Sequence, residues 1–225
     1  ASGQTMIADA TIYCPRKLFG VPDGGLLVGE GASALENWCF PPSCTMMEEQ
    51  YRLLMECYEQ PNTRGNKHNL RWLAHDLEQQ LSRKRMSRIT EAFLRRIPLS
   101  DIVRKRQGNW EILYQSLGRF CLWEITRPDF APFAFPFLVP QDYPVEILHT
   151  LLTRAKVFCR RMWYPLPLIK NLYPLEEALS KRLLLLPCDQ RYGKEDMQRI
   201  AELVIKILED PNWVARKGGS FDITS

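Results

Sequence analysis

Lys17 is the residue whose surroundings most favour covalent chemistry. It follows residues 11–13, where β-branched and aromatic types favour a strand, and it precedes Leu26-Leu27-Val28, which favours a short buried strand. The glycine- and proline-rich segment between them, with Asp23-Gly24-Gly25, predicts a tight turn. A lysine held between two buried strands loses water, which lowers its pKa, and the neutral amine is the form that adds to a carbonyl. Lys17 is therefore a candidate for Schiff-base formation, although a solvated lysine beside an ordinary turn has the same local pattern.

Other charged residues offer weaker candidates. Arg16, next to Lys17, could depress the lysine pKa by like-charge repulsion, or it could pair with Asp23. Asp9 is interpreted as a strand-end residue. Arg191, after the last expected strand, is a candidate for binding a substrate carboxylate or phosphate, and a surface ion pair is the simpler alternative.

Metal chemistry has little support in the sequence. His68, His75 and His149 lack the spacing of metal ligands, and Cys39 and Cys44 have no second cysteine pair to complete a zinc site. We interpret these residues as parts of loops, helices and core.

Composition limits the class of protein. The 225 residues are 45% hydrophobic and 25% charged, with a net charge of +4 that does not by itself imply nucleic acid. Seven cysteines, an odd number, indicate free thiols in a reducing compartment, and we expect a cytoplasmic protein. We expect no membrane span, since no apolar run approaches the ~20 residues that one needs. The chain lacks an initiator Met, so it could be a processed protein or a cut from a longer one.

The first part of the chain continues with a loop and helices. Glycines and the proline pair predict a loop over residues 30–42, and apolar spacing predicts a helix over residues 43–58. A second helical region extends from about residue 70 to residue 97, where Pro98 closes it. Its basic cluster, residues 82–88, could bind phosphate or nucleic acid, but a solvated face or kinked junction is the simpler interpretation because no aromatic residue interrupts it.

The second part of the chain predicts a small α+β domain. Helices are expected at 100–117, 144–152, 174–179 and 195–208, and strands at 120–125, 133–139, 157–159 and 182–186. Pro136 argues that its strand lies at the edge of a sheet or contains a bulge. This order favours a small sandwich with its helices on one face of the sheet. We expect two domains, residues 1–97 and 98–225.

These residues resemble a known family. Lys17, followed after six to eight positions by Asp23-Gly24-Gly25 and then an apolar strand, is similar to the cofactor-lysine segment of DegT/DnrJ-type aminotransferases, which are fold type I pyridoxal-phosphate enzymes. Gly20-Val21-Pro22 departs from the more polar turn usual in that family. The likeness extends to Arg104-Lys-Arg106 before Asn109-Trp110, to Phe135-Pro-Phe137, to Trp163-Tyr-Pro-Leu-Pro167, and to the Leu179–Tyr192 run before Glu195.

The resemblance implies an α/β protein present as its C-terminal half. Residues 1–97 would be the remnant of the pyridoxal-phosphate-binding large domain with connecting helices, and residues 98–225 the small α+β domain. Lys17 would hold the cofactor as a Schiff base and then act as the base that moves a proton at the substrate α-carbon. An amino donor and a keto-acceptor, such as a keto-sugar nucleotide, would be the substrates.

The resemblance also implies that partners are needed. In the family, the carboxylate on the cofactor ring nitrogen and the phosphate cradle come from residues before the lysine, so we expect little or no aminotransferase activity from this chain alone. A homo-oligomer or a complementing N-terminal half would supply them. The alternative is a non-catalytic protein-interaction module derived from the same fold. A nucleic-acid role is a weaker third interpretation.

Overall fold

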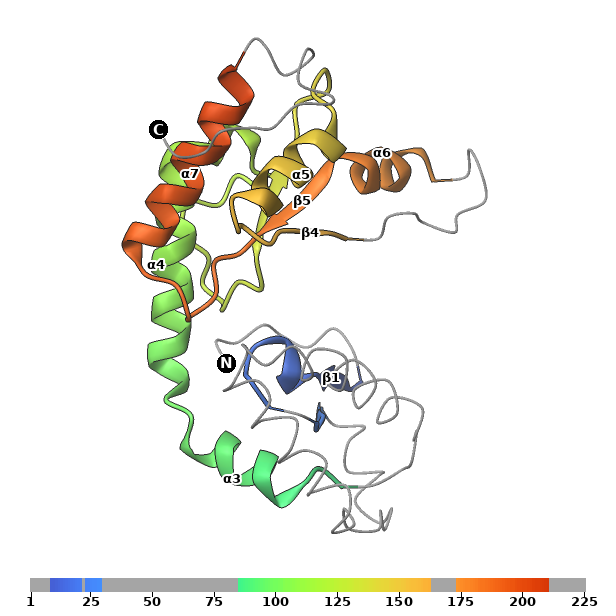
Figure 1. Cartoon of the computed structure of the whole chain (residues 1–225). Helices are drawn as coiled ribbons and strands as arrows, with labels where there is room; N and C mark the ends of the chain where they lie inside the picture. The colour runs from blue at the N-terminus through green and yellow to red at the C-terminus, as the bar shows by residue number, and fades with distance from the viewer. Residues whose placement is uncertain (1–8, 22, 30–84, 163–172, 211–225) are drawn as a thin grey trace, which may run out of the picture. The chain divides into compact units, whose positions relative to one another are not determined.

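The computed structural model describes residues 9–21, 23–29, 85–162 and 173–210 (Figure 1). The chain divides into two compact units at Pro98 and Leu99, beside the expected boundary. Both units that are described combine helices with a small antiparallel sheet, so the protein is of mixed α and β structure. Several predictions lie outside the described residues: the loop at 30–42, the helix at 43–58, residues 70–84 of the second helical region, the run at 163–167, and His68, His75, Cys39 and Cys44.

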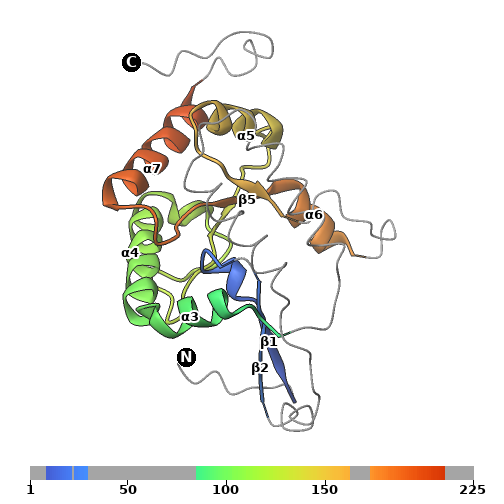
Figure 2. The same ribbon diagram turned by 60° about the horizontal axis from the view of Figure 1, so that its bottom comes forward.

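The first unit contains a two-stranded antiparallel sheet. Strand β1 (Thr11–Tyr13) pairs with strand β2 (Leu26–Val28), so that Thr11 faces Val28 and Tyr13 faces Leu26 (Figure 2). A short 3-10 turn, η1 (Pro15–Lys17), begins two residues after β1. Both predicted strands are confirmed, and Lys17 lies in the connection between them.

The prediction that these strands are buried is wrong. Ile12 is 79% exposed, and Leu26 and Val28 are each close to half exposed. The described sheet of this unit has two strands only, so each strand has one hydrogen-bonded neighbour. A run of apolar residues favours burial only when a second layer covers it, and periodicity alone does not supply that layer.

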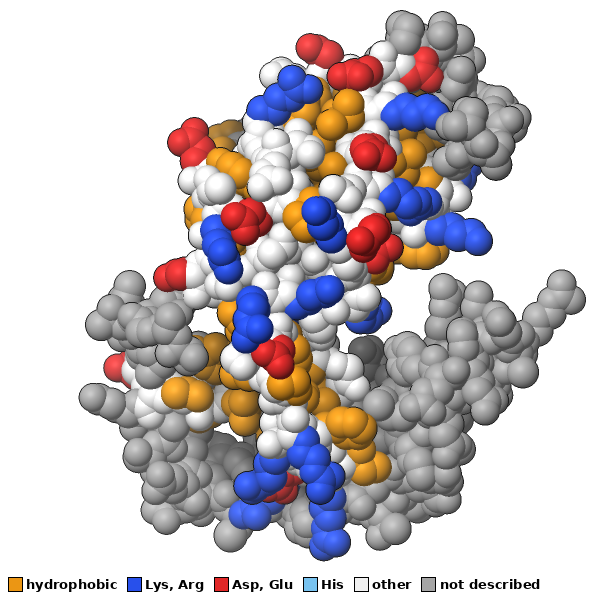
Figure 3. Space-filling model, turned by 90° about the vertical axis from the view of Figure 1, so that its left-hand side faces the viewer, with side chains coloured by type: hydrophobic (Ala, Val, Ile, Leu, Met, Phe, Trp, Pro, Cys, Tyr) orange, Lys and Arg blue, Asp and Glu red, His pale blue; other side chains and the backbone are white. Residues whose placement is uncertain are grey.

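Helix α3 (Arg88–Arg96) completes the described part of this unit. Ser87 is its N-cap, and Ile97 ends it one residue before Pro98, as predicted. The helix does not continue back through the basic cluster, because residues 85–87 are not helical. Arg85 and Arg88 are exposed, as expected of a solvated junction. Blue side chains gather near the bottom of Figure 3, at the level of α3.

The second unit alternates helices and short strands. In chain order it consists of α4 (Leu99–Leu117), η3 (Gly118–Phe120), β3 (Phe135–Leu138), α5 (Val145–Arg154), β4 (Arg160–Arg161), α6 (Pro174–Arg182), β5 (Leu183–Leu186) and α7 (Lys194–Glu209). The three strands form an antiparallel sheet in the order β3-β5-β4. Pro136 therefore lies on an edge strand, as predicted. Helices α4 and α7 pack side by side, and α7 also contacts α5 (Figure 1).

Two of the strand predictions in this unit need correction. Residues 120–125 form a single bridge, Cys121 to Phe137, because Trp123 stacks on Trp110 and Trp110 Nε1 donates to the Ile125 carbonyl at 2.8 Å, which turns the chain around the indole ring. The strand predicted at 157–159 begins three residues later, as β4. Val157 N donates to the Leu152 carbonyl, so residues before 158 still complete the end of α5.

The core of the second unit lies between its sheet and its helices. Its fully buried side chains include Trp110, Phe135, Phe137, Leu113, Leu117, Leu148, Leu152, Leu184, Leu186, Met197 and Ile207. The predicted last helix is confirmed as α7, whose Met197, Ile200, Val204 and Ile207 are all buried. No helix in the described ranges combines the length and the apolar composition that crossing a bilayer needs.

Candidate functional site

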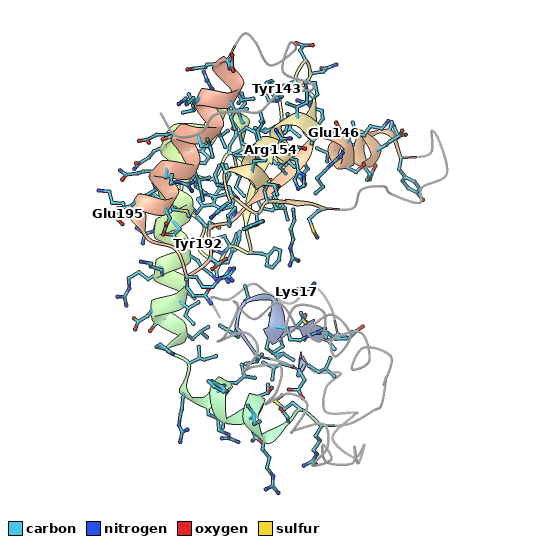
Figure 4. All side chains as sticks on the ribbon, viewed as in Figure 1. Lys17, Tyr143, Glu146, Arg154, Tyr192 and Glu195 are labelled. Atoms are coloured by element: carbon cyan, nitrogen blue, oxygen red, sulfur yellow. The ribbon has the colours of Figure 1, made fainter. Side chains whose placement is uncertain are left out.

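Lys17 occupies the last position of η1. Its backbone N–H donates to the Cys14 carbonyl at 3.1 Å, and the N–H groups of Leu18 and Phe19 both donate to the Pro15 carbonyl. Pro15 is buried, which anchors the start of the turn. The side chain of Lys17 is exposed (Figure 4). The predicted desolvation of this amine is therefore wrong for the described structure, because the side chain that carries it is exposed.

Asp23 anchors the other end of the turn. One oxygen of its carboxylate accepts from the Ser87 backbone N–H at 2.8 Å, and the other accepts from the Ser87 hydroxyl at 3.0 Å and from the Thr90 hydroxyl. Ser87 and Thr90 are both fully buried. Arg16 could have paired with Asp23, but the carboxylate is directed at the start of α3 instead, and Arg16 is exposed.

Gly24 permits this close approach. Its φ of +95° lies in the left-handed region that favours glycine. A Cβ atom at this position would lie 3.1 Å from Thr90 Cγ2 and 3.4 Å from Met86 Cβ. In the Asp-Gly pair, the aspartate accepts hydrogen bonds from the start of α3. The glycine, which has no Cβ, allows the backbone to lie close to that helix. The sequence predicted a turn here but not its partner, since nothing local identifies residues 87 and 90.

Arg191 forms the ion pair that was its simpler interpretation. Its Nε donates to Asp189 Oδ1 and its second guanidinium nitrogen to Oδ2, both at 2.8 Å. This hydrogen bonding raises the pKa of Arg191, while burial acts in the opposite direction. Burial raises the pKa of Asp189, but the hydrogen bonds and charge of Arg191 outweigh burial, so the pKa of Asp189 lies below its usual value. Arg191 belongs to the second unit and Lys17 to the first, and each is described within its own unit.

Arg106 and Asn109 hold the segment that carries Arg191, a role that sequence reasoning missed. Arg106 is buried; its Nε donates to Gln190 Oε1 at 2.6 Å and a terminal nitrogen donates to the Pro132 carbonyl at 2.7 Å. Burial lowers the pKa of Arg106. Asn109 Nδ2 donates to the Asp189 carbonyl at 2.9 Å. The sequence signal for this role was the basic run that precedes Asn109-Trp110. The contacts indicate that Arg106 and Asn109 position the segment around Asp189 and Gln190.

Metal-ligating residues do not converge in the described part of the chain. No group of three or more His, Cys, Asp or Glu side chains there could hold an ion. His149 has a ring nitrogen 3.2 Å from the Cys159 carbonyl, a contact within the second unit. Burial raises the pKa of Cys159 to about 11 and that of Cys188 to about 12, so neither is a reactive thiolate near neutral pH.

Comparison with known proteins gives no match that assigns the site, which is therefore described by its geometry. No protein-family model matches the chain, and no curated protein is significantly similar to it. The candidate site is therefore defined by the exposed amine of Lys17 and by a turn that is anchored at Pro15 and at Asp23.

Proposed function

We propose that this chain is the C-terminal part of a pyridoxal-phosphate-dependent aminotransferase-like protein of the DegT/DnrJ type. In this proposal Lys17 binds the cofactor, and the complete protein transfers an amino group from a donor to a keto-substrate such as a keto-sugar nucleotide. The observation that supports it best is an accessible primary amine on a turn held at both ends. The family resemblance of that turn and the α+β character of the second unit support it further.

The cofactor fits the described residues only in part. Pyridoxal phosphate, when bound, supplies the electron sink for amino-group transfer. Lys17 offers the amine that would hold it. Asp23, however, is engaged with Ser87 and Thr90, so its carboxylate is not available to a ring nitrogen. The described residues therefore do not form a complete cofactor site, and we expect no transamination from this chain by itself.

The test uses pyridoxal phosphate as the probe. The chain is incubated with a small excess of it, reduced with borohydride and mapped by peptide mass spectrometry. Lys17→Arg is compared with Lys105→Arg, which changes an exposed lysine on α4 in the second unit. We expect Lys17 to carry more of the reduced adduct than Lys105, and Lys17→Arg to remove that excess while Lys105→Arg leaves it.

The contrary outcome is equally clear. If the adduct is spread over exposed lysines without preference for Lys17, the assignment of Lys17 to the cofactor fails. The same experiment on the chain expressed with any coding sequence that precedes it should increase the preference and give a yellow protein. A colourless product in that form would also contradict the proposal.

A non-catalytic interaction module is the second candidate. The exposed apolar residues of the β1–β2 sheet favour it, above all Ile12 at 79% exposure. In that case Lys17→Arg would leave the properties of the protein unchanged, whereas Ile12→Ser would reduce association measured by sedimentation. If the enzyme proposal holds, Lys17→Arg should reduce cofactor binding and Ile12→Ser should leave cofactor binding unchanged.

A further inference from the structure

We propose that Asp23 is a positioning residue for Lys17. Its carboxylate clamps the turn that carries the lysine to the first turn of helix α3, and so fixes where the amine is presented. This inference rests on the proposed function, because it assigns a role toward the amine of Lys17.

One carboxylate forms every hydrogen bond of this clamp. Its two oxygens accept from one backbone N–H and two hydroxyl groups, all supplied by Ser87 and Thr90. Both donor residues are excluded from solvent, and the bonds span 64 and 67 positions of the chain. Hydrogen bonds to an ionised acceptor are stronger than neutral ones, and solvent exclusion makes their loss costly.

Helix α3 does not need Asp23 as its cap. The Ser87 hydroxyl already accepts from the Thr90 backbone N–H at 3.2 Å, which is the ordinary N-cap bond. A further carboxylate at a helix N-terminus is favourable because of the helix dipole. The Asp23 bonds therefore act on the turn as well, because they join it to the first turn of α3.

The turn between the two anchors is short. Lys17 lies two residues after buried Pro15 and six before Asp23, and Val21 between them is also buried. A segment fixed at both ends has few backbone conformations, so the position from which the Lys17 side chain extends is restricted. Restricting a nucleophile in this way raises its effective concentration toward a carbonyl held nearby. Release at Asp23 removes the anchor at that end of the turn.

The experiment compares Asp23→Asn with Asp196→Asn. Asp196 is the matched control, because its carboxylate accepts from the Gly193 backbone N–H at 2.8 Å at the start of α7 in the second unit. Two quantities are measured on the whole chain. The first is hydrogen exchange at the amides of Lys17, Leu18 and Phe19. The second is the ratio of borohydride-trapped pyridoxal phosphate on Lys17 to that on Lys105.

We expect Asp23→Asn to speed exchange at these three amides by about tenfold, the factor that loss of one charge-assisted hydrogen bond gives a local opening equilibrium. The Lys17 to Lys105 ratio should fall several-fold, and Asp196→Asn should change neither quantity. If Asp23→Asn proves unstable, Thr90→Val removes one donor and keeps the shape, and it should shift both quantities in the same direction.

The outcomes separate this inference from the proposed function. Unchanged exchange at Lys17, Leu18 and Phe19 in both variants overturns the positioning role, whatever the adduct shows. Faster exchange together with an unchanged adduct ratio also overturns it, because the turn would then be structural only. Absence of any Lys17 preference in the wild-type chain refutes the proposed function, and the exchange result still decides whether Asp23 clamps the turn.

Discussion

At the scale of single residues, two carboxylates each accept several hydrogen bonds that fix nearby chain segments. Asp23 gathers donors from α3, and Asp189 forms a two-point pair with Arg191. Both acceptors are met by donors in fixed positions, which is the condition under which a charged hydrogen bond contributes to stability. The two differ in how far apart the partners lie along the sequence: Arg191 is two positions from Asp189, whereas Ser87 is 64 positions from Asp23.

The Asp189–Arg191 pair predicts a pH-dependent stability. The folded-state pKa of Asp189 is depressed, so its contribution is present above the unfolded pKa of about 3.9 and is lost as pH falls through the lower folded pKa. Asp189→Asn should reduce the free energy of unfolding by about 1 kcal/mol at pH 7, and this difference should shrink as pH falls through the depressed folded-state pKa of Asp189. Urea titrations at several pH values measure it.

Asp101→Asn provides the control for that titration. Asp101 pairs with Arg104 with both side chains more than 60% exposed, so its removal should change the stability little at any pH. A difference for Asp189→Asn that stays constant down to pH 2, or that equals the Asp101→Asn value, would contradict the role assigned to the pair.

At the scale of elements, helix ends decide where the chain changes direction. Lys156 follows the end of helix α5, has a φ of +62° and is the only non-glycine residue with positive φ in the described ranges. The Lys156 N–H donates to the Thr153 carbonyl, and Val157 N–H donates to the Leu152 carbonyl, which is the pattern of a helix end that usually carries glycine. This ending directs the chain into β4 at Arg160.

Lys156→Gly should therefore stabilise the protein. Glycine adopts this backbone without the steric penalty that a Cβ causes, so the free energy of unfolding should rise by up to about 1 kcal/mol. Thermal unfolding followed by circular dichroism measures the change. Lys156→Ala removes the same charge but keeps Cβ, so it should bring little gain. Equal gains in the two variants would show that charge, not backbone strain, is responsible.

At the scale of the whole molecule, the second unit holds a continuous apolar core around Trp110 and Phe135. Val21 and Pro15 are buried in the described part of the first unit. Burial of apolar area is the main source of stability, and this core gives the second unit such a source of its own.

We therefore expect residues 99–225 to fold when expressed alone. The fragment should unfold cooperatively in urea, and amides of α7 should be protected from hydrogen exchange as in the full chain. Leu113→Ala in the fragment should cost about 2–5 kcal/mol, because Leu113 is fully buried. A non-cooperative transition, or equal exchange of α7 in the fragment and in the unfolded chain, would show that the first unit is required.

The amino-acid sequence by itself determined the elements whose signals are local. Apolar periodicity located α4 and α7, Pro98 located a helix end, and Pro136 indicated an edge strand. Only the tertiary structure decided which surfaces are covered and which distant groups meet. The exposure of Lys17 depends on whether a layer covers the hairpin, and the Asp23 clamp depends on donors 64 positions away, because neither leaves a trace in the neighbouring residues.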